Sequence, residues 1–360
     1  MTFSGDFTYE SRPGRVVLRP GAAVSATPGE AEHLGLSRLL VVCGRRGEAV
    51  ARAVADALGD RCAGLHAEAR MHVPVEDADR AVAAARAAGA DGVVAVGGGS
   101  SIGLCKAIAL HTGLPLIAVP STYSGSEMTP VWGLTENGAK RTGRDPKVQP
   151  RSVVYDPELT LSLPVPLTVT SGVNALAHAV EALYAPDTSP LIALMAEEGV
   201  RAMTGALPEL AADPGDVEAR GQALYAAWLC GSCLGATTMG LHHKLCHVLG
   251  GTFGLPHAET HTVVLPYALA HNSPAIPDAL TVLGRALGTD DPAQALWELA
   301  GRLGAPRSLA ELGFKEGDVA KAAAQVTGQP YANPRPVTAD GVRAVLAAAY
   351  EGRPPSVPDR

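Results

Sequence analysis

Short apolar runs alternate with alanine-rich amphipathic stretches from Arg38 to Pro120, and this alternation constrains the fold more than any other feature of the chain. Apolar runs of strand length bounded by turn residues predict buried strands, whereas the alanine-rich stretches have the period of a helix. Strands and helices in alternation are typical of βαβ units, with a parallel sheet between layers of helices. The expected strands are residues 38–44, 61–67, 92–96 and 115–122, and the expected helices are residues 47–58, 75–89 and 101–110.

Two further segments predict hairpins. Asn137-Gly138 lies between strand-like runs, and this dipeptide favours the tight turn of a hairpin. A last strand should follow that hairpin. At the amino terminus, residues 7–18 (FTYESRPGRVVL) predict another hairpin, which precedes the alternating segment.

The strand signals disappear after about residue 160, and the rest of the chain consists of helical patterns separated by proline and glycine. A chain of 360 residues is also longer than one compact core usually accommodates and suits two domains. We therefore expect an α/β fold, with a Rossmann-like parallel-sheet domain over residues 1–160 followed by an all-helical domain over residues 161–360.

Composition narrows the class of protein. Hydrophobic residues make up 47% of the chain and charged residues 18%, which predicts an ordinary globular protein. The formal net charge is −7 and no basic stripe is present, so we expect no nucleic-acid partner. The amino terminus lacks the charged start and apolar run of a signal peptide, which predicts a cytoplasmic location.

Residues 221–241 carry no charge and approach the length of a membrane span, but their polar residues make them only moderately apolar. We interpret them as a helix buried in a helical domain and expect no membrane contact. The six cysteines are scattered through a chain without an export signal, which favours reduced thiols. Cys230 and Cys233 are then small core residues one helical turn apart.

A glycine-rich loop follows the strand expected at residues 92–96. Gly97, Gly98 and Gly99 let the backbone approach a phosphate closely, and with Ser100 they lead into a helix whose first N–H groups attract an anion. The loop differs from the GxGxxG fingerprint, so by itself it is equally compatible with a tight turn that binds no ligand.

A second loop of hydroxyl and glycine residues, PSTYSGSE at 120–127, follows the next strand. Ligands of open α/β sheets bind in the crevice at the carboxyl ends of the strands. The two loops together therefore favour a nucleotide. In the second loop, the candidate ligands of that nucleotide are Ser121, Thr122 and Ser126.

Four of the eleven histidines occur in the segment HHKLCHVLGGTFGLPH at 242–257. This density indicates a metal site, a proton relay or an anion site. His243 and His247 are four residues apart and so share one face of a helix.

Asn174 and His178 have the same spacing on another expected helix, so the two helices could converge on one pocket. His257 follows Pro256 in a turn. For His242 and His261 we expect ordinary structural roles.

These motifs resemble a known family. GGGS before a helix, the TxxxGSE loop, the NALAHAVEA helix and the HxxxHxxGxxxxxPH pattern are similar, in this order over nearly the whole chain, to the iron-type (group III) alcohol dehydrogenases. The resemblance implies an NAD(P)-binding domain, a helical domain and an active site in the cleft between them. The stretches TYSGSEMTPVWGLTENG, SGVNALAHAVEALYAP and HHKLCHVLGGTFGLPHAETHTVVLP most resemble members that reduce maleylacetate.

Metal-dependent members of the family hold their ion with an aspartate and three histidines, and these places fall here on Asn174, His178, His243 and His257. An amide in place of the carboxylate leaves the double charge of the ion uncompensated, so we expect no metal. Maleylacetate needs none, because its double bond is conjugated to its ketone. Hydride can add to the β carbon, and hydrogen-bond donors can stabilise the enolate before it is protonated.

The resemblance and the residue types together assign candidate roles. Gly44 stands where an acidic residue would bind a ribose 2′-hydroxyl and repel a 2′-phosphate, and Arg45 follows it, so we expect both NADH and NADPH to be used.

The two substrate carboxylates need cations, although a solvated surface role for either candidate cation stays open. The expected catalytic residues are His178, His243, His247, His257 and Asn174, and the expected substrate ligands are Lys244, Tyr123 and Arg335.

The expected reaction is the NAD(P)H-dependent reduction of maleylacetate to 3-oxoadipate, in the breakdown of aromatic compounds. Two alternatives stay open: a metal-dependent alcohol or polyol dehydrogenase of the same fold, and a nucleotide-binding sensor without turnover. Bound metal after gentle purification would indicate the first, and the absence of NADH oxidation with keto acids would indicate the second. The family also implies a homodimer.

Overall fold

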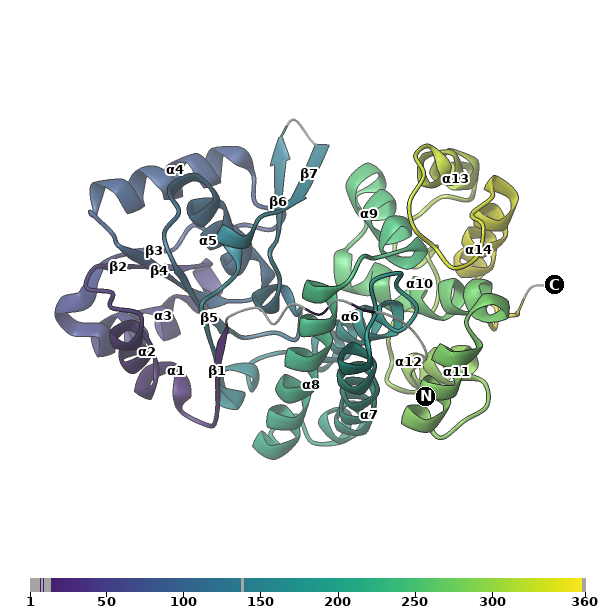
Figure 1. Ribbon diagram of the computed structural model, residues 1–360, viewed down its shortest axis with the longest axis horizontal. Helices are drawn as coiled ribbons and strands as arrows, with labels where there is room; N and C mark the ends of the chain where they lie inside the picture. The colour runs from purple at the N-terminus through teal and green to yellow at the C-terminus, as the bar shows by residue number, and fades with distance from the viewer. Residues whose placement is uncertain (1–6, 8, 10–13, 137–138, 358–360) are drawn as a thin grey trace. The chain divides into compact units, whose positions relative to one another are not determined.

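The computed structural model describes residues 7, 9, 14–136 and 139–357 (Figure 1). The chain separates into two compact units. One unit ends at Leu163 and also includes Gly215–Tyr225, while the other comprises Pro164–Pro214 and the chain from Ala226 onward. The main change of unit thus lies close to residue 160, whereas the sequence pattern does not anticipate that Gly215–Tyr225 belongs with the first unit.

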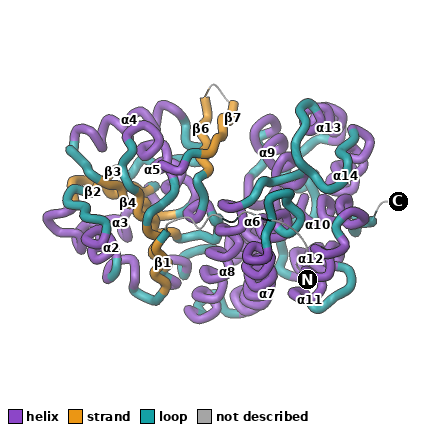
Figure 2. Tube along the Cα trace, viewed as in Figure 1, coloured by secondary structure: helices purple, strands orange, loops and turns teal. Residues whose placement is uncertain are grey.

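The first unit contains a six-stranded sheet with the strand order β1-β8-β5-β4-β2-β3. All of its neighbouring strands are parallel, which confirms the expected α/β class. The strands, orange in Figure 2, are β1 (Arg15–Leu18), β2 (Leu39–Cys43), β3 (Cys62–His66), β4 (Gly92–Gly97), β5 (Leu116–Pro120) and β8 (Ser152–Tyr155).

Helices cover both faces of this sheet. In β2, Leu39 and Val41 pack into one apolar layer, and Leu40 and Val42 pack into the opposite one. Burial on both faces explains why the central strands are continuous apolar runs in the sequence. One layer contains α1 (Ala22–Ser25), α2 (Thr27–His33) and α3 (Glu48–Leu58), and the other contains α4 (Val75–Ala87) and α5 (Gly99–Thr112).

The second strand of the amino-terminal hairpin expected over residues 7–18 is present as β1. Strand β1 pairs in parallel with β8, with Arg15 opposite Ser152 and Leu18 opposite Tyr155. Residues 8 and 10–13 of the expected hairpin lie outside the described residues. An apolar run predicts a strand but not its partner, and here the partner is supplied by the far end of the unit.

The hairpin around Asn137-Gly138 is confirmed. Strands β6 (Val131–Glu136) and β7 (Ala139–Arg144) are antiparallel and form their own two-stranded sheet. The two turn residues themselves lie outside the described residues.

Beyond Tyr155, the described residues form only helices and turns, as expected. Helix α10 packs against α6, α9, α12 and α14 and is buried without interruption from Thr260 to Asn272. The helices are α6 (Val165–Ala182), α7 (Pro190–Ala212), α8 (Val217–Ala236), α9 (Leu241–Phe253), α10 (His257–Asn272), α11 (Pro277–Leu287), α12 (Pro292–Arg302), α13 (Val319–Thr327) and α14 (Ala339–Glu351).

The uncharged segment 221–241 forms most of α8, and its Cys230 and Cys233 are fully buried. Burial raises the pKa of the Cys233 thiol to about 12, and all six cysteines are unpaired. No single described helix is long and apolar enough to cross a membrane, and α8 and α9 meet that criterion only as a pair bent by 96°.

Candidate functional site

The sheet topology places three loops at the carboxyl ends of adjacent strands. From β2 the chain adds β3 on one side and then returns to add β4 on the other, so the strand order reverses between β2 and β4. Open α/β sheets bind ligands at such a switch point. The loops concerned begin after Cys43, Gly97 and Pro120.

The loop after β4 has no room for side chains at its first two glycines. Gly97 has a φ of +133°, and a Cβ there would lie 2.6 Å from Ser101 Oγ. A Cβ on Gly98 would lie 2.9 Å from Thr122 Cγ2. Helix α5 begins at Gly99, and its first N–H groups have no partner within the helix and can bind an anion.

The loop after β5 lies directly beside the glycine loop, since the Ser121 amide donates to the Gly97 carbonyl at 3.1 Å. Thr122 Oγ1 is buried against Gly98 and has no hydrogen-bond partner. A buried hydroxyl is normally hydrogen-bonded, and a phosphate oxygen would satisfy this one. Ser100, in the first turn of α5, is half-buried. These residues therefore fit the pyrophosphate of a dinucleotide.

A buried lysine supports the second loop and is not singled out by the sequence pattern. Lys106 Nζ donates to the carbonyl oxygens of Ser126 and Thr129 at 2.7 and 2.8 Å, so Ser126 contributes its backbone here. Burial lowers the pKa of Lys106 to about 7, and burial also raises the pKa of nearby Glu127 to about 7. The available sequence signal was a single cation inside the apolar helix SIGLCKAIAL.

The loop after β2 carries positive charge. Gly44 is closely packed, because a Cβ there would lie 3.1 Å from the carbonyl oxygen of Ala69. Arg45 and Arg46 follow and are exposed, and the first acidic residue is Glu48. A carboxylate at this strand end would repel a 2′-phosphate, and two guanidinium groups have the opposite effect.

In the second unit, helices α6 and α9 both pack against α10. Helix α6 is buried from Thr168 to Ala182, although it carries three polar residues, Asn174, His178 and Glu181. Their spacing of four and three residues places them on one face of the helix. Polar groups buried in this way require partners, and α9 supplies them for His178 and Glu181.

Glu181 is the partner of the amino terminus of α9. Its carboxylate accepts hydrogen bonds from the amides of Gly240 at 3.0 Å, His242 at 2.7 Å and His243 at 3.4 Å. It also lies 2.6 Å from His243 Nδ1. The positive end of the helix dipole adds to the stabilisation of a negative charge here.

These contacts determine the tautomer of His243. A carboxylate that accepts several N–H groups is an acceptor only, so His243 Nδ1 carries the proton and donates it to Glu181. Nε2 of the neutral ring is then an acceptor. His178 Nδ1 lies 2.9 Å from that atom and donates to it. The result is a directed series of hydrogen bonds that runs from His178 through His243 to Glu181.

The other predicted catalytic residues differ in exposure. Asn174 is buried, and its Oδ1 has no hydrogen-bond partner. His247 and His257 are exposed. Ring centroids lie 6.3 Å apart for His247 and His243, and 4.4 Å apart for His257 and His261. The structure therefore gathers the predicted histidines into one continuous set of ring contacts.

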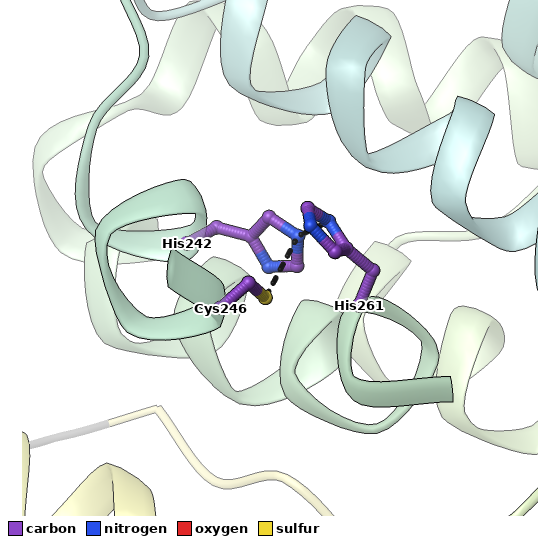
Figure 3. Close-up of side chains that lie close together, drawn as sticks. All are labelled: His242, Cys246 and His261. Atoms are coloured by element: carbon purple, nitrogen blue, oxygen red, sulfur yellow. Dashed lines mark hydrogen bonds between the residues drawn. The ribbon is translucent and has the colours of Figure 1, made fainter. Parts of the chain in front are cut away.

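His242 and His261 form a buried cluster with Cys246 (Figure 3). His242 Nε2 lies 2.9 Å from His261 Nδ1 and 3.7 Å from Cys246 Sγ. Within the described part of the chain, the possible ligand atoms of this trio all lie within 4.8 Å of one another. The second nitrogens, His242 Nδ1 and His261 Nε2, have no partner, whereas metal-bound imidazoles normally donate their second N–H to an acceptor. The cluster is therefore a poor metal site.

Burial lowers the pKa of both His242 and His261 well below the usual value, and the neighbouring histidines lower it further. Both rings are consequently neutral at physiological pH. The sequence spacing alone could not bring this pair together, because His242 lies on α9 and His261 on α10.

Two predicted substrate ligands lie in different surroundings. Lys244 is half-buried, with Nζ 5.8 Å from the ring centroid of Tyr331. Tyr123 is fully buried, and its hydroxyl accepts a hydrogen bond from Arg220 Nη1 at 3.2 Å. A side chain without exposed surface packs in the interior, so the structure does not support Tyr123 as a substrate ligand.

Arg335, the third predicted substrate ligand, lines a cavity of about 520 Å³ between α10, α14 and the segment before α14. Its Nη1 donates to the carbonyl oxygen of His271 at 3.0 Å. The lining of this cavity includes none of the predicted catalytic residues. The structure therefore places Arg335 in a pocket of its own.

The residues at the metal positions of the family do not suit a divalent ion. Asn174, His178, His243 and His257 are all neutral donors, and the first three are buried. The carboxylate of Glu181, on the same face of α6, is hydrogen-bonded to Nδ1 of His243, the nitrogen that faces away from His178. An ion on these residues would keep its full charge in a poorly solvated place, which is unfavourable.

Two protein-family descriptions match the chain. Residues 13–157 match the description "Iron-containing alcohol dehydrogenase", and residues 168–350 match "Fe-containing alcohol dehydrogenase family, C-terminal". Together the two matches cover most of the chain.

Individual proteins are similar over almost the whole length. A maleylacetate reductase of Sphingobium indicum is 53% identical over 349 residues, which are 97% of this chain and 99% of that protein. The crystal structure of maleylacetate reductase from Rhizobium sp. strain MTP-10005 has a TM-score of 0.94 at 51% identity and covers 98% of this chain and 100% of its own. An iron-containing alcohol dehydrogenase from Corynebacterium glutamicum has a TM-score of 0.94 at 44% identity, over 99% of each chain.

Proposed function

The chain belongs to the iron-containing alcohol dehydrogenase family and is a nicotinamide-dependent oxidoreductase of the maleylacetate reductase type, and from this premise we propose how its residues carry out the reaction. Maleylacetate is reduced to 3-oxoadipate. The hydride donor is NADH or NADPH, bound through the loops after β2, β4 and β5. Identity of 53% to a maleylacetate reductase over nearly the full chain supports maleylacetate as the substrate. The glycine loop supports the binding of a nucleotide.

The reduction is an addition across a conjugated double bond. The nicotinamide supplies hydride to the carbon β to the ketone. The electron pair of the double bond moves toward the ketone and gives an enolate, and a proton then adds to the carbon between them. One hydride and one proton are consumed, and the ketone itself is retained in the product.

The directed chain Glu181, His243, His178 is the observation that carries the chemical assignment. When His178 is protonated, its Nδ1–H donates to His243 and its Nε2–H can donate to the enolate. The ionised Glu181 stabilises the imidazolium through His243, which it holds in the required tautomer. This series of hydrogen bonds thus prepares His178 to stabilise the enolate and deliver the proton.

The remaining predicted residues have supporting roles in this proposal. Asn174 Oδ1 is a buried acceptor one turn before His178, and a hydroxyl or carboxylic group of the substrate could donate to it. His247 and His257, which are exposed, face solvent-accessible surface from which substrate or nicotinamide can be contacted. Lys244 is the cation proposed for a substrate carboxylate.

The reaction is proposed to proceed without a metal, because the enolate needs only the donors described and the four neutral donors suit an ion poorly. We also retain the homodimer and the cytoplasmic location as proposals. The homodimer is what the resemblance to the family implies.

A metal-dependent alcohol or polyol dehydrogenase is the second candidate. It is favoured by the similarity to an iron-containing alcohol dehydrogenase and by the unpartnered Oδ1 of Asn174, an oxygen that could coordinate an ion. The absence of a carboxylate among the four positions argues against it.

The decisive experiment follows NADH absorbance with maleylacetate generated enzymatically from a ring-cleavage product. We expect stoichiometric NADH oxidation and formation of 3-oxoadipate by the purified protein. The same assay with simple alcohols and NAD⁺, with and without added Fe²⁺ or Zn²⁺, tests the second candidate. Oxidation of alcohols with a metal but no turnover of maleylacetate would overturn the proposal.

A further inference from the structure

We propose that the cavity lined by Arg335 and His271 is a binding site for a small organic anion with one carboxylate and an apolar body of aryl size. The site goes beyond the proposed function, because its lining includes no residue of the chain Glu181, His243, His178.

The cavity has the size and the walls of a small-molecule site. Its volume is about 520 Å³, within the range of roughly 300 to 1,000 Å³ that is usual for ligand pockets. Tyr267, Pro336, Val345 and Ala348 supply apolar walls. All lining residues belong to the second unit, so the pocket is complete within that unit.

His271 supplies a polar group that lacks a partner. Its side chain is 5% exposed, it lines the cavity, and its Nε2 has no hydrogen bond. Burial, together with Arg335, lowers the pKa of His271, so the ring is neutral and can carry its proton on Nε2. A Cβ on Gly341 would lie 2.9 Å from Cε1 of His271, so only glycine lets α14 pack this closely against the edge of the ring.

Two further features give the same wall of the cavity a positive potential. Arg335 is held beside His271 by its hydrogen bond to the His271 carbonyl at 3.0 Å. Helix α14 begins at Ala339, and its cap Thr338 accepts from the Gly341 amide at 3.1 Å, so the positive end of the helix dipole lies at the cavity. Asp340 opposes this charge weakly, since its side chain is 90% exposed and pairs with Arg343.

This combination selects one carboxylate on an apolar body. A carboxylate matches the planar guanidinium of Arg335, and the positive end of α14 stabilises its charge. Maleylacetate fits poorly, because its second carboxylate would be desolvated against apolar walls without a partner. An aryl group instead buries apolar surface there.

The test uses para-fluorobenzoate as the probe, with para-fluorobenzamide as a neutral molecule of the same shape, and fluorine NMR titration of the full chain. We expect saturable binding of the acid at one site, and at least tenfold weaker binding of the amide. Equal binding of the two probes, or no saturable binding of the acid, would overturn the proposal.

Variants locate the site. Arg335→Gln should weaken binding of para-fluorobenzoate at least tenfold. Ala344→Phe should abolish it, because Ala344 is exposed at the edge of the cavity and a ring there fills the space without changing any charge. Ala344→Phe keeps the test decisive if Arg335→Gln does not fold. Arg343→Gln, on the same helix but outside the lining, is the matched control and should bind normally.

His178→Asn separates this site from the proposed active site. The variant should bind para-fluorobenzoate as the unaltered chain does, whereas loss of maleylacetate turnover in it concerns the proposed function alone. If binding disappears in His178→Asn and persists in Ala344→Phe, the anion occupies the active site and the proposal is wrong.

Discussion

Nε2 of His243 lies 2.9 Å from Nδ1 of His178, and the proton between them belongs to His178 because Glu181 keeps the proton of His243 on its other nitrogen. The two histidines are therefore not equivalent. His243 orients and polarises its neighbour, and His178 is the ring that can exchange a proton with a substrate. Three residues from two helices thus define a direction for proton transfer, which neither helix could define alone.

Glu181→Gln tests this direction. The substitution removes the negative charge that stabilises an imidazolium on His178. Oε1 accepts from the His242 amide, and Oε2 accepts from Gly240 and His243, so the NH₂ group of glutamine faces an N–H donor in either position. We expect kcat for maleylacetate to fall by about 10² to 10⁴, the range typical of a lost general acid, with little change in the KM for NADH. Steady-state kinetics measure both constants.

Glu298→Gln is the matched control for that substitution, since Glu298 is an exposed residue of α12 whose partner is Gln294. Its kinetics should not change. Near-normal kcat in a folded Glu181→Gln variant would show that the tautomer chain plays no part in turnover.

Chelation tests the independence from metal. Activity should survive exhaustive dialysis against EDTA, because the four family positions here are Asn174 and three neutral imidazoles. Asn174→Asp restores a carboxylate and should raise the affinity for Zn²⁺ or Fe²⁺ without increasing maleylacetate turnover. Metal content by atomic absorption and NADH oxidation are the two measurements. Activity that is lost on chelation and recovered with iron or zinc would refute this prediction.

Cofactor choice tests the loop after β2. With Gly44, Arg45 and Arg46 at the strand end, we expect NADH and NADPH to be used with kcat/KM values within about two decades of each other, since one phosphate contact contributes roughly 1.5 to 3 kcal/mol. Arg45→Ala should lower kcat/KM for NADPH more than that for NADH. Arg201→Ala, an exposed arginine of α7, should change neither. A preference for NADH beyond about a thousandfold contradicts the prediction, since that exceeds what one such contact provides.

Much of the fold could be predicted because its strands are buried on both faces. LLVVC and LIAVP are apolar throughout, so their sequence alone indicates strands of a covered parallel sheet. The pairing of β1 could not be predicted in this way. RVVL has the composition of a strand, but its partner β8 is joined to it only through the rest of the unit.

The site could be predicted where its residues are close together in the sequence. Asn174 with His178, and His243 with His247, follow from the helical period. Glu181 was missed because its role depends on the amino terminus of α9, which reaches it from a distant part of the chain. A buried glutamate in the apolar run ALAHAVEAL was the only sequence signal for it.

The buried pair His242 and His261 predicts acid sensitivity. Their folded pKa lies well below the unfolded value near 6.5, so the folded state binds fewer protons than the unfolded state as the pH falls below 6.5. Stability from this pair is thus present above about pH 6.5 and is lost below it, by up to roughly 1.4 kcal/mol per pH unit for each ring. The groups that face the pair are His178, His243, His247, His257 and Cys246.

Replacing both rings by glutamine isolates their share of the pH dependence. Glu127 contributes a pH dependence of stability with the opposite sign. Its pKa is raised to about 7, so its protonation stabilises the fold as the pH falls from 7 toward 4.5. The difference between the unaltered chain and the variant carrying His242→Gln and His261→Gln cancels this contribution. Urea unfolding between about pH 7.5 and pH 5 should show a smaller loss of stability in the double variant. His33→Gln, at an exposed histidine of α2, should keep the full slope, and an equal slope in all three proteins would mean that the buried pair does not titrate on unfolding.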